Sequence, residues 1–329
     1  MAAAAQAGAT PSRLILVGDL HGQLAKTQQA RRRCSAAQPR KRADRAHAAQ
    51  LWQRLEAFCG ADHWPTAKVI FLGDYVDRGP DTCGVLEFLS SLRVRHPRQT
   101  HVFLAGNHDL AMAAFCGQLQ GVAAAGADAA AAGYETWRPN EGALYAAPDA
   151  SGMHLQGRRW AVDVSWRQRS IFNSEAAFAS YGVGYAQRAE LLAAMPEAHK
   201  AFLRDMDWCH TCELPPGAQG APLEGGGTEP AASLIAVHAG LVHYEDVDAQ
   251  VAMLTRRDAN RSFVEQLSNR RDVLDPPPVL AARQTVLVSG HHRKLIMQPW
   301  RLVIDTCGGE HTKPITAVVL PGRACVRSD

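Results

Sequence analysis

Short apolar runs rich in β-branched residues recur along the chain, and each is followed at once by glycine and polar residues. The first three runs are Leu14–Val17, Val69–Leu72 and His101–Ala105. Runs of this length bounded by turn residues are typical of buried strands. The pattern therefore predicts strands whose C-terminal ends lead directly into polar loops.

The loops after these strands carry the candidate chemistry. They are Gly18-Asp19-Leu20-His21-Gly22, Gly73-Asp74-Tyr75-Val76-Asp77-Arg78-Gly79 and Gly106-Asn107-His108-Asp109. In an open α/β sheet the loops at the carboxyl ends of the strands meet at one edge, and ligands bind there. Carboxylate and amide oxygens mixed with imidazole nitrogens suit Mn, Fe, Zn or Mg ions rather than a thiolate site. The residues alone predict a metal-dependent hydrolase.

Two more strands are predicted downstream, and each ends at a histidine. Leu234–Val237 leads to His238, and the run from Val286 leads to His291. Between the first two strands, residues 22 to 68 predict a crossover helix and a second helical stretch near Ala46–Cys59. The whole order predicts an α/β fold.

Composition favours one compact catalytic domain. At 329 residues, 47% hydrophobic and 20% charged, the chain can bury a large core. Residues 1–11 are interpreted as a disordered lead-in, and residues 12–326 as a single domain. Insertions are predicted near residues 31–60, 117–133 and 214–230. The first contains the basic run from Arg31 to Arg42, for which a solvated insertion is favoured over a nuclear-localisation or acidic-partner patch. The second is almost all Ala and Gly, and the third predicts a surface loop.

Charge and hydropathy bear on partners and location. A net charge of +3 is too small to imply nucleic acid or membrane as partner. No run approaches the ~20 apolar residues needed to span a bilayer. The N-terminus lacks the basic start and Leu-rich centre of a secretory signal. We therefore expect a cytoplasmic or nuclear protein.

The eight cysteines are scattered, which is typical of a reducing compartment. Cys209-His210-Thr211-Cys212 has zinc-like spacing, but no second pair follows, so free thiols are favoured over a structural zinc. Cys34 to Arg40 matches C-x₅-R, the core of cysteine-dependent tyrosine phosphatases. Its basic flanks and Pro39 favour coincidence. No cysteine nucleophile is expected.

The order D-x-H, G-D-x-x-D-R-G, G-N-H-[DE] resembles the metallophosphoesterase superfamily, and G-D-Y-V-D-R-G is similar to its phosphoprotein phosphatase (PPP) branch. The late histidines continue this pattern, and Leu302–Thr306 with Ile315–Leu320 resembles the family's final strand pair. The resemblance spans about Ser12 to Val326. It implies a metallophosphoesterase β-sandwich with flanking helices, with the active site at the carboxyl ends of the strands.

The resemblance also implies two divalent metal ions, with Mn expected and Fe or Zn as alternatives. A carboxylate has two oxygens and can bridge two cations ~3.5 to 4 Å apart, which is the role implied for Asp74. A satisfied core or surface residue is the ordinary alternative for any single histidine. The implied metal ligands are Asp19, His21 and Asp74 for the first ion, and Asp74, Asn107, His238 and His291 for the second.

Two cations lower the pKa of a shared water, which supplies hydroxide for direct in-line attack on phosphorus. The resemblance places His108 as the general acid, with Asp77 accepting its ring N–H. Arg78 matches the phosphate clamp and would bind the substrate phosphate together with Asn107. A surface salt bridge is the alternative for Arg78. His292 and His243 are left unassigned.

Departures from the common Ser/Thr phosphatases bear on the substrate. Their L-R-G-N-H-E is replaced here by Leu104-Ala105-Gly106-Asn107-His108-Asp109, and their C-terminal S-A-P-N-Y-C is missing. Their second phosphate-binding arginine is not located, and Arg158 and Arg159 are candidates. Residues 153–160, 178–183 and 195–200 look like the Rhizobiales-like phosphatases, closest to the plant members. That resemblance implies a phosphorylated protein substrate with a phosphotyrosine preference.

Alternatives stay open. A dinucleoside polyphosphate hydrolase is one, because Ser180-Tyr181-Gly182 and a Gly-His late ligand also occur in bacterial enzymes of that class. A Ser/Thr-specific protein phosphatase is another, and a catalytically inactive scaffold is disfavoured because every expected ligand is present. Whether a regulatory subunit binds is left open. Aromatic side chains that could wall a phosphotyrosine slot are Trp160, Trp166, Phe172, Phe178, Tyr181 and Tyr185.

Overall fold

The computed structural model describes residues 12–23, 47–119, 160, 172–222, 228–257, 264–310 and 312–329. Several sequence predictions lie outside these residues. They are the lead-in at 1–11, the basic run 31–42 with Cys34, most of the Ala/Gly segment at 117–133, the candidate arginines Arg158 and Arg159, and Trp166.

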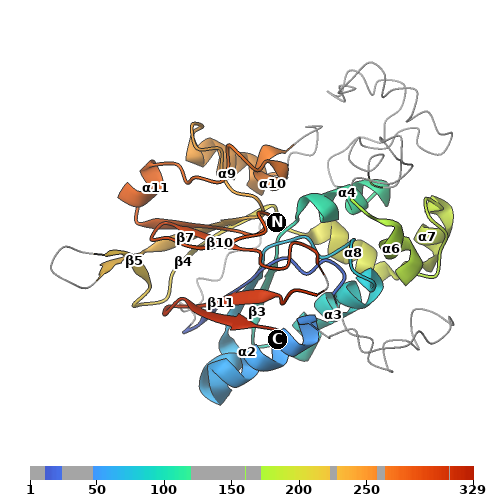
Figure 1. Ribbon diagram of the computed structural model, residues 1–329, viewed down its shortest axis with the longest axis horizontal. Helices are drawn as coiled ribbons and strands as arrows, with labels where there is room; N and C mark the ends of the chain where they lie inside the picture. The colour runs from blue at the N-terminus through green and yellow to red at the C-terminus, as the bar shows by residue number, and fades with distance from the viewer. Residues whose placement is uncertain are drawn as a thin grey trace, which may run out of the picture.

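Two five-stranded sheets form the centre of the molecule (Figure 1). The first has the order β12-β11-β1-β2-β3, and the second has the order β4-β7-β8-β10-β9. The first sheet comprises β1 (Leu14–Val17), β2 (Lys68–Phe71), β3 (Thr100–Phe103), β11 (Thr316–Leu320) and β12 (Ala324–Arg327). The second comprises β4 (Cys209–Glu213), β7 (Ser233–Val237), β8 (Thr285–Ser289), β9 (Leu295–Met297) and β10 (Arg301–Ile304).

The strands that lead into the motifs are parallel within each sheet. β1 pairs with β2 and β2 pairs with β3 in parallel register, and β8 pairs in parallel with β7 and β10. β11, β12, β4 and β9 run antiparallel to their neighbours. The carboxyl ends of the motif-bearing strands therefore gather at one edge of each sheet.

The alternation of side chains along β1 explains how the layers pack. Leu14 and Leu16 join the core between the two sheets, whereas Ile15 and Val17 join the core beneath the helices. Because β1 is covered on both faces, it is apolar at every position, as is usual for buried parallel strands. The sandwich with flanking helices predicted from the sequence is confirmed.

Helices cover both outer faces (Figure 1). On the first sheet lie α2 (His47–His63), which continues into the short η1 (Trp64–Thr66), and α3 (Thr82–Arg95). On the second lie α9 (Val247–Thr255), α10 (Glu265–Ser268) and α11 (Val279–Ala282). At one end are α4 (Asn107–Phe115), α6 (Glu175–Ser180), α7 (Arg188–Ala194) and α8 (Glu197–Asp205). The predicted helical stretch near residues 46–59 corresponds to α2, whose Leu51, Trp52 and Leu55 are buried.

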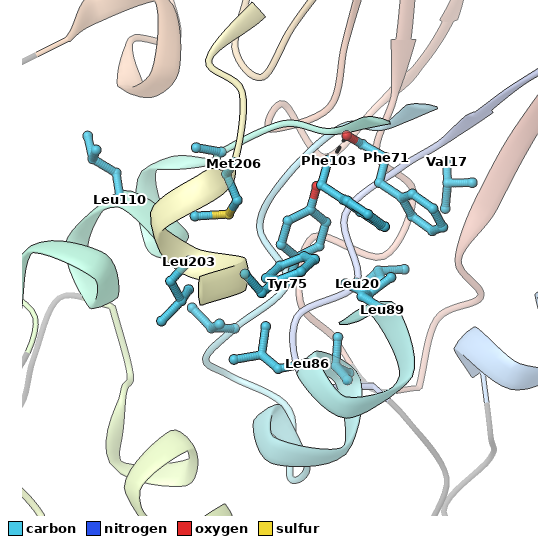
Figure 2. Packing of buried hydrophobic residues seen from close by; sticks show 14 of the residues in the cluster. Val17, Leu20, Phe71, Tyr75, Leu86, Leu89, Phe103, Leu110, Leu203 and Met206 are labelled. Atoms are coloured by element: carbon cyan, nitrogen blue, oxygen red, sulfur yellow. Dashed lines mark hydrogen bonds between the residues drawn. The ribbon is translucent and has the colours of Figure 1, made fainter. Parts of the chain in front are cut away.

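The loop after β2 is anchored by its apolar members. Tyr75 is fully buried and its hydroxyl donates to the Phe71 carbonyl at 3.2 Å. Figure 2 shows Tyr75 packed among Leu86, Leu203 and the other side chains that α3 and α8 contribute to this core. Burial of one large apolar side chain stabilises a fold by ~1.5–3 kcal/mol. This packing fixes the backbone on either side of Tyr75, where the polar motif residues begin.

Two sequence expectations concern strands. Both segments of the predicted final strand pair form strands, but they lie in different sheets: β10 pairs with β8 and β9, whereas β11 pairs with β1 and β12. Both strands are buried at every position, so their sequence does not distinguish the two sheets. Residues 214–230, expected as a loop, contain a hairpin of β5 (Gln219–Pro222) and β6 (Thr228–Pro230). Its prolines stand at strand ends, where a missing N–H is tolerated.

The described cysteines are free thiols. Cys209 and Cys212 lie three residues apart on β4, so they point to opposite faces of the strand and cannot share one metal ion. Among the described helices, none combines the length and apolarity needed to cross a membrane.

Candidate metal centre

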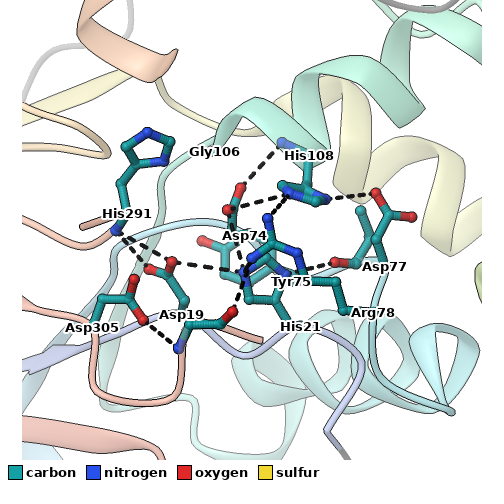
Figure 3. Close-up of polar contacts among 12 residues, drawn as sticks. Asp19, His21, Asp74, Tyr75, Asp77, Arg78, Gly106, His108, His291 and Asp305 are labelled. Carbon is teal, nitrogen blue, oxygen red and sulfur yellow. Dashed lines mark hydrogen bonds and ion pairs between the residues drawn. The ribbon is translucent and has the colours of Figure 1, made fainter. Parts of the chain in front are cut away.

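The two sheets deliver their polar loops to the same place (Figure 3). Asp19, Asp74 and Asn107 follow β1, β2 and β3 of the first sheet, and His238 and His291 follow β7 and β8 of the second. All are buried except Asn107, which is partly buried. The structure thus brings together the residues that the sequence predicts as metal ligands.

Asp74 belongs to two groups of potential metal-binding side chains. One group is His21, Asp74 and His108, and the other is Asp74, His238 and His291; within each, the donor atoms lie within 4.8 Å of one another. The two carboxylate oxygens of Asp74 face different histidines. Oδ1 lies 3.3 Å from Nε2 of His238, and Oδ2 lies 3.4 Å from Nε2 of His21. This arrangement suits a carboxylate shared by two cations.

Unpaired acceptor atoms test whether the site fits metal ions. The Nδ1 atom of His238 donates to the Leu72 carbonyl at 2.6 Å, which leaves Nε2 as the ring atom that faces Asp74. In the same way His291 Nε2 donates to the Ser268 carbonyl at 3.2 Å, which leaves Nδ1 as an acceptor. Within the described residues, His238 Nε2, His291 Nδ1 and Asn107 Oδ1 are buried without a hydrogen bond. A buried hydrogen-bond acceptor without a partner is unfavourable, and a bound divalent cation would give each of these atoms a partner. The set of side chains therefore fits divalent cations.

Two glycines make room for the acidic ligands. A Cβ atom on Gly106 would lie 2.1 Å from Asp74 Oδ1, and a Cβ atom on Gly290 would lie 2.1 Å from Asp19 Oδ1. Asp19 is also fixed by the His291 backbone N–H, which donates to both its oxygens at 3.2 Å. Both carboxylates are therefore held where only glycine can lie beside them.

The electrostatics of the site favour added positive charge. Burial, with the neighbouring carboxylates Asp305 and Asp74, raises the pKa of Asp19 well above its usual range. Burial opposes ionisation of Asp74 too, but His238 and His108 outweigh it and hold the pKa of Asp74 well below its usual range. For His238, burial acts to lower the pKa, yet the Asp74 carboxylate raises it. Closely spaced buried acids and histidines with perturbed pKa values are typical of functional sites.

Backbone strain is concentrated in the same loops. Non-glycine residues with left-handed φ include His21 (43°), Asp74 (54°), Asp77 (67°), Arg78 (59°) and His291 (66°). Each such residue is unfavourable by ~1–3 kcal/mol unless its surroundings enforce it, and such residues cluster at functional sites. These predicted site residues are therefore held by their surroundings rather than by local preference.

Asp109 enforces the strained loop after β2, a role that sequence reasoning missed. Its carboxylate accepts N–H bonds from Asp74 at 2.6 Å, Tyr75 at 2.8 Å and Gly106 at 2.9 Å. Burial and the Asp74 carboxylate raise the pKa of Asp109 to about 7. Its position at the third residue of α4 is the usual site of a capping carboxylate, and this signal could have found it.

The predicted proton donor has the expected partner. Nδ1 of His108 lies 2.8 Å from Oδ2 of Asp77, and both residues are buried. The indole N–H of Trp160 donates to the same carboxylate, at 3.0 Å to Oδ1 and 2.9 Å to Oδ2. Burial raises the pKa of Asp77 well above its usual range, and the Trp160 hydrogen bond opposes that shift. Burial lowers the pKa of His108.

Arg78 contacts two members of the first group of potential metal ligands, His21 and His108. Its Nη1 donates to His21 Nε2 at 3.0 Å and to the Gly308 carbonyl at 3.1 Å, and its Nη2 donates to His108 Nε2 at 2.8 Å (Figure 3). Within the part of the chain that the structure describes, no carboxylate lies within ion-pair distance of Arg78, so the surface salt bridge is not observed. Binding of a metal through His21 Nε2 would require this guanidinium to turn away.

Two further charged residues near the site were missed. Arg270 donates to the His291 carbonyl at 2.6 Å, and burial followed by the nearby charges of Arg293 and Arg78 lowers its pKa. Asp305 accepts from the backbone N–H of Arg293 at 2.7 Å and lies close enough to Asp19 to raise its pKa. No motif marks Arg270 in the sequence. A bound anion would relieve the repulsion that Arg270 receives from Arg293 and Arg78.

The suggested aromatic wall is mostly core. Trp160 stacks on Phe178 at 4.9 Å between ring centroids, Tyr185 packs against Phe178 at 5.5 Å, and the Tyr181 hydroxyl lies 2.8 Å from Nδ1 of His199. Phe172 differs, because its ring meets the His108 ring edge to face at 5.0 Å. Among the described members of this set, Phe172 therefore lies against the predicted proton donor.

Residues 12–146 match the family model described as calcineurin-like phosphoesterase. No match was found among curated protein sequences.

Three solved structures are similar over most of the chain at low identity. One is a putative diadenosine tetraphosphatase, with 15% identity, 96% of this chain and 92% of that chain covered, and a TM-score of 0.44. Another is a cold-active protein tyrosine phosphatase, with 12% identity, coverage of 96% and 76%, and a TM-score of 0.47. The third is a cold-active protein tyrosine phosphatase of the psychrophile Shewanella sp., with 12% identity, coverage of 97% and 81%, and a TM-score of 0.46.

Proposed function

We propose that this chain belongs to the calcineurin-like phosphoesterase superfamily, whose model matches residues 12–146, and that it is a phosphoprotein phosphatase that uses two divalent ions and prefers phosphotyrosine. The observation that carries the proposal is the position of Asp74. Its two oxygens face His21 and His238 at 3.4 and 3.3 Å, and unpaired acceptors of Asn107 and His291 lie in the same site.

The proposed ligands divide between two ions. When bound, the ions supply Lewis acidity for the attack of water on phosphorus. The residues that would hold them are Asp19, His21 and Asp74 for one ion, and Asp74, Asn107, His238 and His291 for the other. Mn is the proposed activator. Chelation should abolish turnover and added Mn should restore it, whereas full activity after complete removal of metal would contradict the proposal.

The chain's own residues bind the phosphate and move the proton. Arg78 presents two N–H groups toward the site and binds the phosphate oxygens, with Asn107 beside it. His108, oriented by Asp77, protonates the leaving oxygen through Nε2, because its Nδ1 is engaged by the carboxylate. We assign the second phosphate-binding arginine to Arg270, because its charge interacts with that of Arg78 and it is tied to the His291 loop.

The phosphotyrosine preference is supported by Phe172. Its ring contacts the His108 ring, so an aromatic leaving group at the proton donor would lie near a second aromatic ring. An aromatic leaving group gains from such a contact, and a phenolate needs less protonation than an alkoxide. The proposed partner is therefore a phosphorylated protein, with dinucleoside polyphosphates and phosphoserine or phosphothreonine as the alternatives.

The decisive experiment compares these substrates side by side with the Mn-loaded enzyme. Matched phosphotyrosyl, phosphothreonyl and phosphoseryl peptides and diadenosine tetraphosphate are assayed, with Asp74→Asn as the control for contaminating activity. We expect kcat/KM on phosphotyrosine to exceed that on phosphoserine by at least ~10-fold, about 1.4 kcal/mol. Phe172→Leu should narrow this ratio.

Other outcomes assign other functions. Faster turnover of diadenosine tetraphosphate would make the chain a dinucleoside polyphosphate hydrolase. A phosphoserine preference would place it with the Ser/Thr enzymes. No turnover of any ester by a metal-loaded, folded protein would favour the inactive scaffold.

A further inference from the structure

We propose that Trp160 is a positioning residue for proton transfer: its indole N–H fixes the Asp77 carboxylate, which in turn fixes the His108 ring. The inference rests on the proposed function, since it concerns the residue assigned there as proton donor. It adds a role for a side chain that the sequence marked only as a candidate aromatic wall.

Two successive hydrogen-bond contacts link Trp160 to Asp77 and Asp77 to His108. The indole nitrogen of Trp160 lies within 3.0 Å of both Asp77 oxygens, and one of these oxygens also receives the His108 Nδ1–H at 2.8 Å. Trp160 and Asp77 are fully buried, and His108 is 1% exposed. Because the carboxylate is shielded from solvent, its orientation depends on these protein donors.

Trp160 is itself held in one orientation. Its ring stacks on Phe178 at 4.9 Å and packs on Phe115 at 5.1 Å, and the Ser174 hydroxyl donates to its carbonyl. Phe115 is the last residue of α4, and His108 lies in the first turn of the same helix. Trp160 therefore contacts the C-terminal end of α4 through Phe115. Through Asp77 it also fixes the His108 ring near the N-terminal end of the same helix.

The arrangement has a specific chemical consequence. A two-pronged N–H donor keeps Oδ2 of Asp77 aimed at Nδ1 of His108, so that Nε2 carries the transferable proton. Without the indole N–H, an aromatic ring at position 160 can still pack, but the Asp77 carboxylate loses a donor that fixes its rotation. The loss of activity should therefore appear only on substrates whose leaving group needs protonation.

The test is Trp160→Phe, which keeps an aromatic ring and removes the N–H. Trp64→Phe is the matched control, because Trp64 is also buried and its indole nitrogen has no hydrogen bond among the described residues. Each variant is assayed on p-nitrophenyl phosphate, whose leaving group needs little protonation, and on benzyl phosphate, an alkyl ester with a ring of similar size.

We expect Trp160→Phe to lower kcat on benzyl phosphate by ~10- to 100-fold, the effect of one hydrogen bond to a charged group. Turnover of p-nitrophenyl phosphate, KM and bound metal should stay close to wild type, and Trp64→Phe should change neither rate. In an Asp77→Asn background, Trp160→Phe should add nothing. An equal loss on both esters, no loss on either, or full additivity with Asp77→Asn would overturn the inference.

A second measurement does not depend on enzyme activity and does not require a Trp160 variant to fold. In the full-length protein, Asp77→Asn should move the Trp160 indole N–H resonance and speed its hydrogen exchange, while the Trp64 resonance stays in place. An unchanged Trp160 resonance would refute the contact. Wild-type protein that hydrolyses neither ester would instead refute the proposed function, so the two failures are distinguishable.

Discussion

Gly106→Ala adds one methyl group beside the Asp74 carboxylate and removes no other atom of the site. Gly106 has an extended backbone (φ −91°, ψ 176°) that alanine adopts freely, so the effect is steric and not conformational. The new Cβ would lie 2.1 Å from Asp74 Oδ1 and 2.5 Å from the Asp74 nitrogen, whereas real Cβ contacts stay beyond 3.0 Å. The carboxylate must therefore retreat by about 1 Å.

A displacement of this size is expected to be severe. Misplacement of a reacting group by ~1 Å can lower rates by ~10²-fold, and overpacking of a tight interior lowers stability by ~1–3 kcal/mol. Because Asp74 faces both His21 and His238, we expect Gly106→Ala to weaken binding of both metal ions. Gly290→Ala places a methyl 2.1 Å from Asp19 Oδ1 and should weaken only one ion.

The assay combines metal titration by calorimetry, thermal unfolding and turnover of p-nitrophenyl phosphate. Gly322→Ala is the control, since nothing lies within 4 Å of the added Cβ there. A Gly106→Ala protein with two tightly bound ions and wild-type kcat would refute the reasoning. So would a Gly290→Ala protein that loses both ions together.

Three further predictions concern single side chains. Asp74→Asn should lower activity more than Asp19→Asn, because it weakens both metal sites; steady-state rates and metal content decide this, and the reverse order would remove the bridging role. His108→Ala should lower kcat by ~10²- to 10⁴-fold with metal retained, least on p-nitrophenyl phosphate and most on an alkyl ester; equal losses would exclude the proton-donor role. Asp109→Asn turns an amide N–H₂ toward backbone N–H groups that donate to Asp109, so we expect a loss of ~1–3 kcal/mol in urea unfolding, and unchanged stability would contradict this role.

What the sequence predicted well is local in the chain. Each motif follows its strand directly, so a residue such as Asp19 or Asp74 is placed as soon as the strand before it is recognised. The predicted run Leu14–Val17 is β1, and the run Val69–Leu72 differs from β2 by one residue at each end. Parallel strands then bring the loops together because their carboxyl ends share an edge.

What the sequence did not predict depends on partners far away along the chain. The hydrogen bond from Trp160 to Asp77 joins residues 83 positions apart, and no periodic pattern encodes it. The sequence pattern does not show which ring an aromatic side chain will contact, so it could not predict that Phe172 lies against His108 whereas Phe178 stacks on Trp160. Arg270 lies in an irregular segment without a motif, and only the fold places it beside the His291 loop.

The position of β11 between β12 and β1 bears on how the protein is made. β1 is synthesised before the other described strands, but its antiparallel partner β11 follows about 300 residues later. At ~5–20 residues per second, translation leaves that edge of β1 unpaired for roughly 15–60 s. An open, apolar strand edge is a template for pairing with other chains. Nascent chains on one polysome therefore expose this strand edge to one another and can aggregate through it. A chaperone that shields the first sheet during translation should raise the yield of folded protein.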